Sequence, residues 1–142
     1  MDQRDRYKAT TLRILGKFQL LEFSLKYYIG FSYQLIHKTL DGALHFGYTI
    51  DDVDNFPLER LLNIFSKLNN NTELHKRLNA LRVKRNHVAH KSLLVTFGWD
   101  GSGSLEKADE EFFYLEDEVH ECLQAVRDEL VAVKTTLFGP PA

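Results

Sequence analysis

LEDEVHECLQAVRDELVAVKTTL, residues 115–137, is the stretch of sequence that decides the fold. Its apolar positions recur at intervals of three and four residues, which places them along one face of an α-helix. These positions are Leu115, Val119, Cys122, Val126, Leu130, Val133 and Leu137. A seam of this kind is typical of helical bundles, in which each helix buries one apolar face against its neighbours.

Three further helices are predicted before this one. Residues 7–40 carry apolar side chains at helical spacing, and Gly30 is a point where this helix bends or splits. After a loop over residues 41–55, Pro57 suits the first position of a second helix, which ends at the asparagines 69–71. Asn71 or Thr72 caps a third helix. The predicted core face of the third helix consists of Leu74, Leu78, Leu81 and Val88.

The predicted fold is therefore all-α: an up-and-down bundle of four to five helices that forms a single domain over residues 1–142. The composition, 44% hydrophobic and 27% charged, is that of an ordinary globular domain with a core of its own. An alternative for residues 95–97 and 112–114, on either side of a glycine-rich loop over residues 97–103, is a pair of short strands.

Cysteine content and hydropathy indicate a cytoplasmic protein. Cys122 is the only cysteine, so an internal disulfide and a four-cysteine zinc site are both excluded. The charged residues 1–6 lead into no apolar signal segment, and no run approaches the roughly 20 apolar residues that a membrane span needs. We therefore expect no membrane partner.

The charges of the second half of the chain are segregated. Between Glu73 and Asp100 there are six basic residues and no acidic one, whereas from Asp100 to Glu129 there are eleven acidic residues and two basic ones. A net charge of −2 therefore conceals a local positive surface. The alternative is that the basic and acidic segments pair with each other, within one chain or across a dimer.

The basic segment contains the sequence KRNHVAH, residues 84–90. Continuing the core row of the third helix by four residues from Leu81 leads to Arg85, so a charged residue occupies an apolar position. Because burying a guanidinium without partners is unfavourable, Arg85 must find a carboxylate, point into a cleft or face another subunit. Asn86 and His90, four residues apart, stack on one side of the helix, with Arg85 flanking them.

These three side chains suit metal-free cleavage of RNA. Arginine matches phosphate oxygens in two-point contacts, and a histidine can take a proton from a 2′-hydroxyl and return one to a leaving oxygen. Asn86 would orient His90 or bind a phosphate. A single histidine is not well suited to carry out both proton transfers. A twofold dimer that apposes two copies of this helix would supply a second histidine. The scheme requires no cofactor.

The motif Arg85-Asn86-x-x-x-His90, on the penultimate helix of a small bundle, resembles the R-x(4–6)-H signature of the HEPN-domain family. That resemblance implies a HEPN-like helical bundle, a homodimer with the motif at its interface and metal-independent endoribonuclease activity. It also implies a toxin with a cognate antitoxin protein, or a defence effector against phage. One extended form of the signature, R-x4-H-x-Y, is not met, because Ser92 stands in the tyrosine position.

Other residues have supporting or competing interpretations. Glu22 is a candidate for the carboxylate that orients Arg85 across the bundle, or else a solvated residue at the edge of the apolar stripe. RNA-backbone contacts are predicted for Arg82, Lys84 and Lys91, with a solvated helix face as the alternative. His87 and His90 lack the further ligands that zinc requires, so no metal site is predicted. Packing in the core or a dimer is favoured over base stacking for Tyr27, Tyr28, Phe31 and Tyr33.

The sequence thus predicts an endoribonuclease of the HEPN type whose catalytic residues are Arg85, His90 and Asn86, supported by Glu22. Two alternatives remain. The chain is a non-catalytic HEPN module that binds nucleotide, RNA or a partner protein, or it is a helical interaction protein that pairs Arg85 within a dimer interface.

Overall fold

The computed structural model describes residues 3–96 and 102–140, and these are helical apart from their connecting loops. The elements in chain order are α1 (Gln3–Leu40), the 3₁₀ helix η1 (Ile50–Val53), α2 (Leu58–Leu68), α3 (Thr72–Thr96) and α4 (Ser102–Phe138). The all-α prediction is confirmed for the described residues. The alternative strand pair is wrong, because residues 95 and 96 belong to α3 and residues 112–114 to α4, while Phe97 lies outside the described residues.

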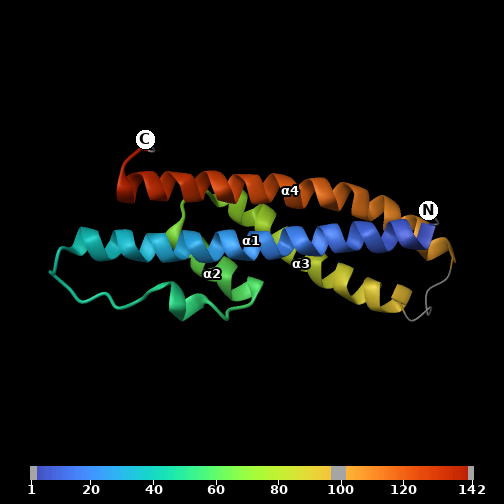
Figure 1. Cartoon of the computed structure of the whole chain (residues 1–142), viewed down its shortest axis with the longest axis horizontal. Helices are drawn as coiled ribbons and strands as arrows, with labels where there is room; N and C mark the ends of the chain where they lie inside the picture. The colour runs from blue at the N-terminus through green and yellow to red at the C-terminus, as the bar shows by residue number, and fades with distance from the viewer. Residues whose placement is uncertain (1–2, 97–101, 141–142) are drawn as a thin grey trace.

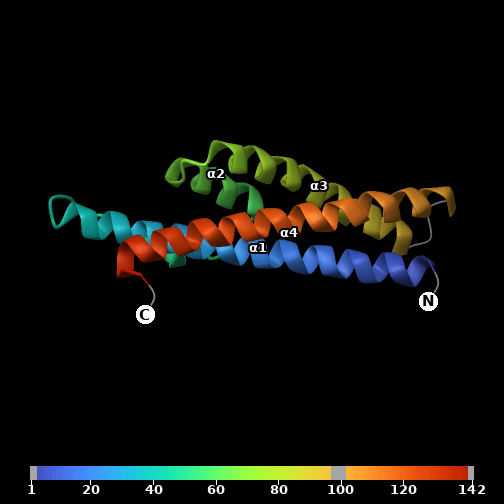
Figure 2. The ribbon, with the colours of Figure 1, turned by 90° about the horizontal axis from the view of Figure 1, so that it is seen from above.

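The four α-helices form two layers. The long helices α1 and α4 lie side by side along their lengths, and the hairpin of α2 and α3 packs across one face of that pair (Figure 1). Seen from above, α2 and α3 lie together on the same side of α1 and α4 (Figure 2). The opposite face of the α1–α4 layer is turned away from the hairpin.

The helix directions depart from an up-and-down bundle. Arg13 contacts Glu116 near one end of the long pair, and Lys38 contacts the carbonyl of Leu137 at the other, so α1 and α4 run parallel. The loop over residues 41–57 accounts for the difference, because it carries the chain back along α1 before α2 begins (Figure 1). As a result α1 and α2 point in the same direction, and α3 alone runs against the other three (Figures 1 and 2).

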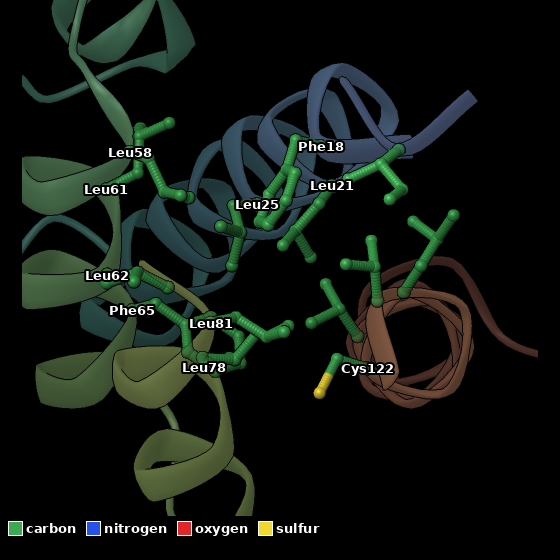
Figure 3. Packing of buried hydrophobic residues seen from close by; sticks show 14 of the residues in the cluster. Phe18, Leu21, Leu25, Leu58, Leu61, Leu62, Phe65, Leu78, Leu81 and Cys122 are labelled. Carbon is green, nitrogen blue, oxygen red and sulfur yellow. The ribbon is translucent and has the colours of Figure 1, made fainter. Parts of the chain in front are cut away.

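The core lies between the two layers, where leucine and phenylalanine side chains from α1, α2 and α3 meet the face of α4 that carries Cys122 (Figure 3). The predicted α4 seam is buried at five of its seven positions, and Leu130 and Val133 are partly buried. The four predicted core residues of α3 are all buried: Leu74, Leu78, Leu81 and Val88. Helical periodicity therefore identified the core faces of both helices correctly.

Three local features refine the predicted boundaries. Helix α1 continues through Gly30, where a Cβ atom would lie 2.9 Å from the Cβ of Ile50, so this glycine permits a close approach of η1. Pro57 has an extended backbone and precedes the first residue of α2 instead of being that residue. Asn71 caps α3, because its Oδ1 accepts a hydrogen bond from the amide of Leu74 at 3.1 Å.

Candidate functional site

Arg85 of α3 forms an ion pair with Glu22 of α1. Its Nη2 lies 3.7 Å from Oε1 of Glu22, and the exposed fractions of the two side chains are 41% and 23%. The carboxylate expected from the sequence is therefore present, and it comes from the neighbouring helix. At 3.7 Å the contact is electrostatic and too long for a strong hydrogen bond. The guanidinium thus keeps donors for a further anion, while its buried Nε has no hydrogen-bond partner among the described residues.

His90 and Asn86 lie on the exposed face of the same helix. Five residues of α-helix separate His90 from Arg85 by about 140° around the axis and roughly 7.5 Å along it. Since Arg85 faces α1 and His90 faces solvent, a single chain does not converge the two side chains on one point. Any chemistry that needs both of them requires a second copy or a large substrate that wraps around the helix.

Four basic residues of α3, including Arg85, pair with acidic residues of other helices. Lys84 donates to Glu118 of α4 at 2.7 Å, and Arg82 lies 3.6 Å from Glu59 of α2. Arg77, near the start of α3, also reaches α4, at 2.9 Å from Glu121. The pairing of the basic and acidic segments is therefore intramolecular in part. Lys91, the third predicted RNA contact, is partly buried.

A cavity of about 370 Å³ opens between α3 and α4 beside the motif. Its lining residues are Lys84, His87, Val88, Phe112, Tyr114, Leu115 and Glu118. Arg85 and His90 do not line it, because they lie on other faces of α3. The aromatic residues 112–114 were a sequence signal for this cavity, but they were considered only as an alternative short strand.

A second polar cluster was missed from the sequence. Asn69, 7% exposed, donates to the hydroxyl of Tyr28 at 3.0 Å and to Oε2 of Glu129 at 3.1 Å. Its Oδ1 accepts from the amide of Asn71 at 2.8 Å and lies 3.0 Å from Nε2 of His75. The asparagine run 69–71 was the available signal, but it predicted only the end of a helix.

Within residues 3–96 and 102–140, no group of three or more histidine, cysteine, aspartate or glutamate side chains is placed to hold a metal ion. The described helices include none that is long and apolar enough to cross a bilayer.

No protein-family model, curated protein or solved structure matches this chain. The resemblance to the HEPN family therefore rests on the motif from Arg85 to His90.

Proposed function

We propose that the chain is a metal-independent endoribonuclease of the HEPN type, active as a homodimer, with a toxin or anti-phage role. The observation that supports this proposal is the Arg85–Glu22 pair. Glu22 lies 3.7 Å from a guanidinium that is still 41% exposed and keeps donors that Glu22 does not occupy, so this group can receive a phosphate. Arg85 is a cationic side chain at an otherwise apolar position of α3, and its exposed donors can bind an anionic ligand.

In the proposed reaction Arg85 binds the scissile phosphate, and the His90 side chains of the two copies transfer the protons. The imidazole removes the proton of the 2′-hydroxyl, the 2′-oxygen forms a bond to phosphorus, and the bond from phosphorus to the 5′-oxygen breaks. The other His90, as an imidazolium, protonates the departing 5′-oxygen. The products are a 2′,3′-cyclic phosphate and a 5′-hydroxyl end. Asn86 assists His90, and Arg82, Lys84 and Lys91 lie along the same helix to contact the RNA backbone.

The test is cleavage of an end-labelled RNA by the purified full chain in EDTA. We expect Arg85→Ala and His90→Ala each to slow cleavage by at least about 100-fold, the range in which acid–base and electrostatic catalysis operate. His87→Ala is the matched control, since it removes a neighbouring exposed imidazole from the same helix and should leave the rate within a factor of about 3. Cleavage that survives both Arg85→Ala and His90→Ala would refute the proposal.

The ion pairs of α3 favour a second candidate, a non-catalytic HEPN module that binds nucleotide or RNA. Glu22 offsets the charge of Arg85, and Glu118 and Glu59 do the same for Lys84 and Arg82. Glu22→Gln distinguishes the two candidates. If Glu22 orients Arg85 for catalysis, the rate of RNA cleavage falls. If Glu22 only offsets its charge in a binding module, RNA binds more tightly and no product forms.

A further inference from the structure

Three aromatic rings meet where the loop over residues 41–57 runs back along α1 (Figure 1). They belong to Tyr33 of α1 and to Phe46 and Tyr48 of the loop, and we call them the aromatic trio. The three centroid separations are 5.6, 5.7 and 5.6 Å, and the ring planes are inclined to one another by 64°, 40° and 66°. The rings therefore form a nearly equilateral, tilted group instead of a parallel stack.

The aromatic trio lines a cavity of about 410 Å³ beside the final turns of α1. Small-molecule sites in proteins usually measure about 300–1,000 Å³, so this volume suits a small ligand. The other lining residues include the polar side chains of Gln34, His37 and Thr49. Among the described lining residues there is no lysine or arginine, and His37 is the one side chain that can carry a positive charge.

The local sequence explains why the rings meet. Phe46 and Tyr48 are two residues apart in a non-helical segment, a spacing that places side chains on one side of an extended chain. Gly47 between them has no room for a side chain, because a Cβ atom there would lie 2.8 Å from Nε2 of His45. The close approach of η1 to Gly30 then holds the loop against the helix that carries Tyr33.

Other aromatic rings of this chain are covered by cations of the chain itself. The guanidinium carbon of Arg60 lies 3.8 Å from the ring centroid of Phe56. The ammonium of Lys134 lies 5.6 Å from the ring centroid of Phe31. Of the lysines and arginines that the structure describes, none lies over the aromatic trio in this way. The trio is therefore an aromatic surface whose cation has to come from outside these residues.

The charges near the aromatic trio are negative. Residues 41–57 contain four aspartates and neither lysine nor arginine. Asp52 is held in place by a hydrogen bond of 2.7 Å that its Oδ2 accepts from the amide of Thr49. Burial raises the pKa of the Tyr33 phenol, and the negative charges of Asp52 and Tyr48 raise it further. The carboxylate of Asp52 is thus close enough to act on the trio, where it would stabilise a cation.

We propose that the aromatic trio binds a small organic cation of the quaternary or methylated ammonium class. Aromatic faces attract such cations when the charge lies within roughly 6 Å of the ring centroid. From the separations of the three centroids, a cation about 4 Å above the centre of the trio would lie roughly 5 Å from each ring. A phosphate or carboxylate ligand is disfavoured, because anion sites rely on arginine or lysine donors, which the described lining does not provide.

This site is separate from the motif on α3, since neither Arg85 nor His90 lines the cavity. The proposal therefore stands whether or not the chain cleaves RNA, and its failure would leave the proposed nuclease untouched.

The first test compares two ligands by isothermal titration calorimetry on the full chain. We expect choline to bind with a dissociation constant of about 1 mM or lower. Its neutral isostere, in which a tert-butyl group replaces the trimethylammonium group, should bind at least about 10-fold more weakly, because it lacks the charge that the rings attract. Equal binding of the two ligands, or no binding of choline at about 10 mM, overturns the proposal.

A peptide that carries a trimethyllysine distinguishes the two sources of this chemistry. If the peptide binds more tightly than choline, the cation belongs to a protein partner. If choline binds more tightly, the ligand is a free small molecule. Both results support the site, and the loss of both on replacement of the trimethyllysine by unmodified lysine and of choline by its neutral isostere confirms that the quaternary ammonium group is what is recognised.

The second test locates the site with variants of one ring. Tyr48→Leu keeps an apolar side chain but removes the aromatic face, so choline affinity should fall about 3- to 30-fold. Tyr48→Phe retains the ring and should stay within a factor of about 2 of the wild type. Tyr27→Leu is the matched control, because Tyr27 is 50% exposed against 61% for Tyr48 and lies outside the cavity. Choline affinity that survives Tyr48→Leu, or falls equally in Tyr27→Leu, overturns the assignment to the aromatic trio.

Discussion

The most informative stability prediction concerns Asn69, which joins three helices through its amide group. It follows the last residue of α2, and its side chain contacts Tyr28 on α1 and Glu129 on α4, as well as His75 on α3. Asn71 adds a hydrogen bond from its own Nδ2 to Oε1 of Glu129 at 3.0 Å. The turn between α2 and α3 is therefore fixed to both long helices by one connected polar network.

Replacing Asn69 with alanine removes four close polar contacts at once. A neutral hydrogen bond contributes about 1 kcal/mol net, and one to a charged acceptor such as Glu129 contributes more. Water that enters from the exposed side will replace part of this network, so the full sum does not apply. We therefore expect Asn69→Ala to lower the free energy of unfolding by about 3 kcal/mol, or the Tm by roughly 10 °C.

Urea denaturation followed by circular dichroism measures this loss, and Asn70→Ala is the control. The side chain of Asn70 is exposed and belongs to the same turn, so its replacement should change the free energy of unfolding by no more than about 0.5 kcal/mol. The slope of the transition should be equal in both variants. A loss below about 1 kcal/mol for Asn69→Ala would refute the reasoning, because it would mean that water satisfies the network as well as the protein does.

Two further predictions concern α1. Gly30→Ala should destabilise the protein by about 1–2 kcal/mol in thermal melts, because its Cβ would meet the Cβ of Ile50 at 2.9 Å, whereas Gly16→Ala, with nothing within 4 Å, should stabilise it by about 0.5–1 kcal/mol. The hydrogen bond from Arg13 lowers the pKa of Glu116, so this pair stabilises the fold above the unfolded pKa of about 4.3 and loses its effect as the pH falls through the folded value. Glu116→Gln should therefore cost about 0.5–1 kcal/mol at pH 7 and nothing near pH 2, as measured by urea denaturation at each pH.

Sequence periodicity predicted the helices and their core faces because both depend on local spacing. The row Leu74, Leu78 and Leu81 is buried, as is most of the α4 seam. The direction of each helix is a different kind of property, since it depends on the path of the loop over residues 41–57. That path is set by contacts between residues far apart in sequence, such as Ile50 on Gly30, and no local pattern encodes them. The up-and-down topology was therefore predicted wrongly while the helices themselves were identified.

The candidate site, too, was predictable from the sequence only in part. Periodicity alone showed that Arg85 interrupts an apolar row and needs a partner, and the structure provides one in Glu22. Periodicity also separates His90 from Arg85 by about 140°, and no packing within one chain can remove that angle while α3 stays helical. A site that uses both residues therefore depends on assembly, and assembly depends on surfaces. Arg85 of one copy and His90 of another can serve one substrate only where the contact between the copies brings their α3 helices together.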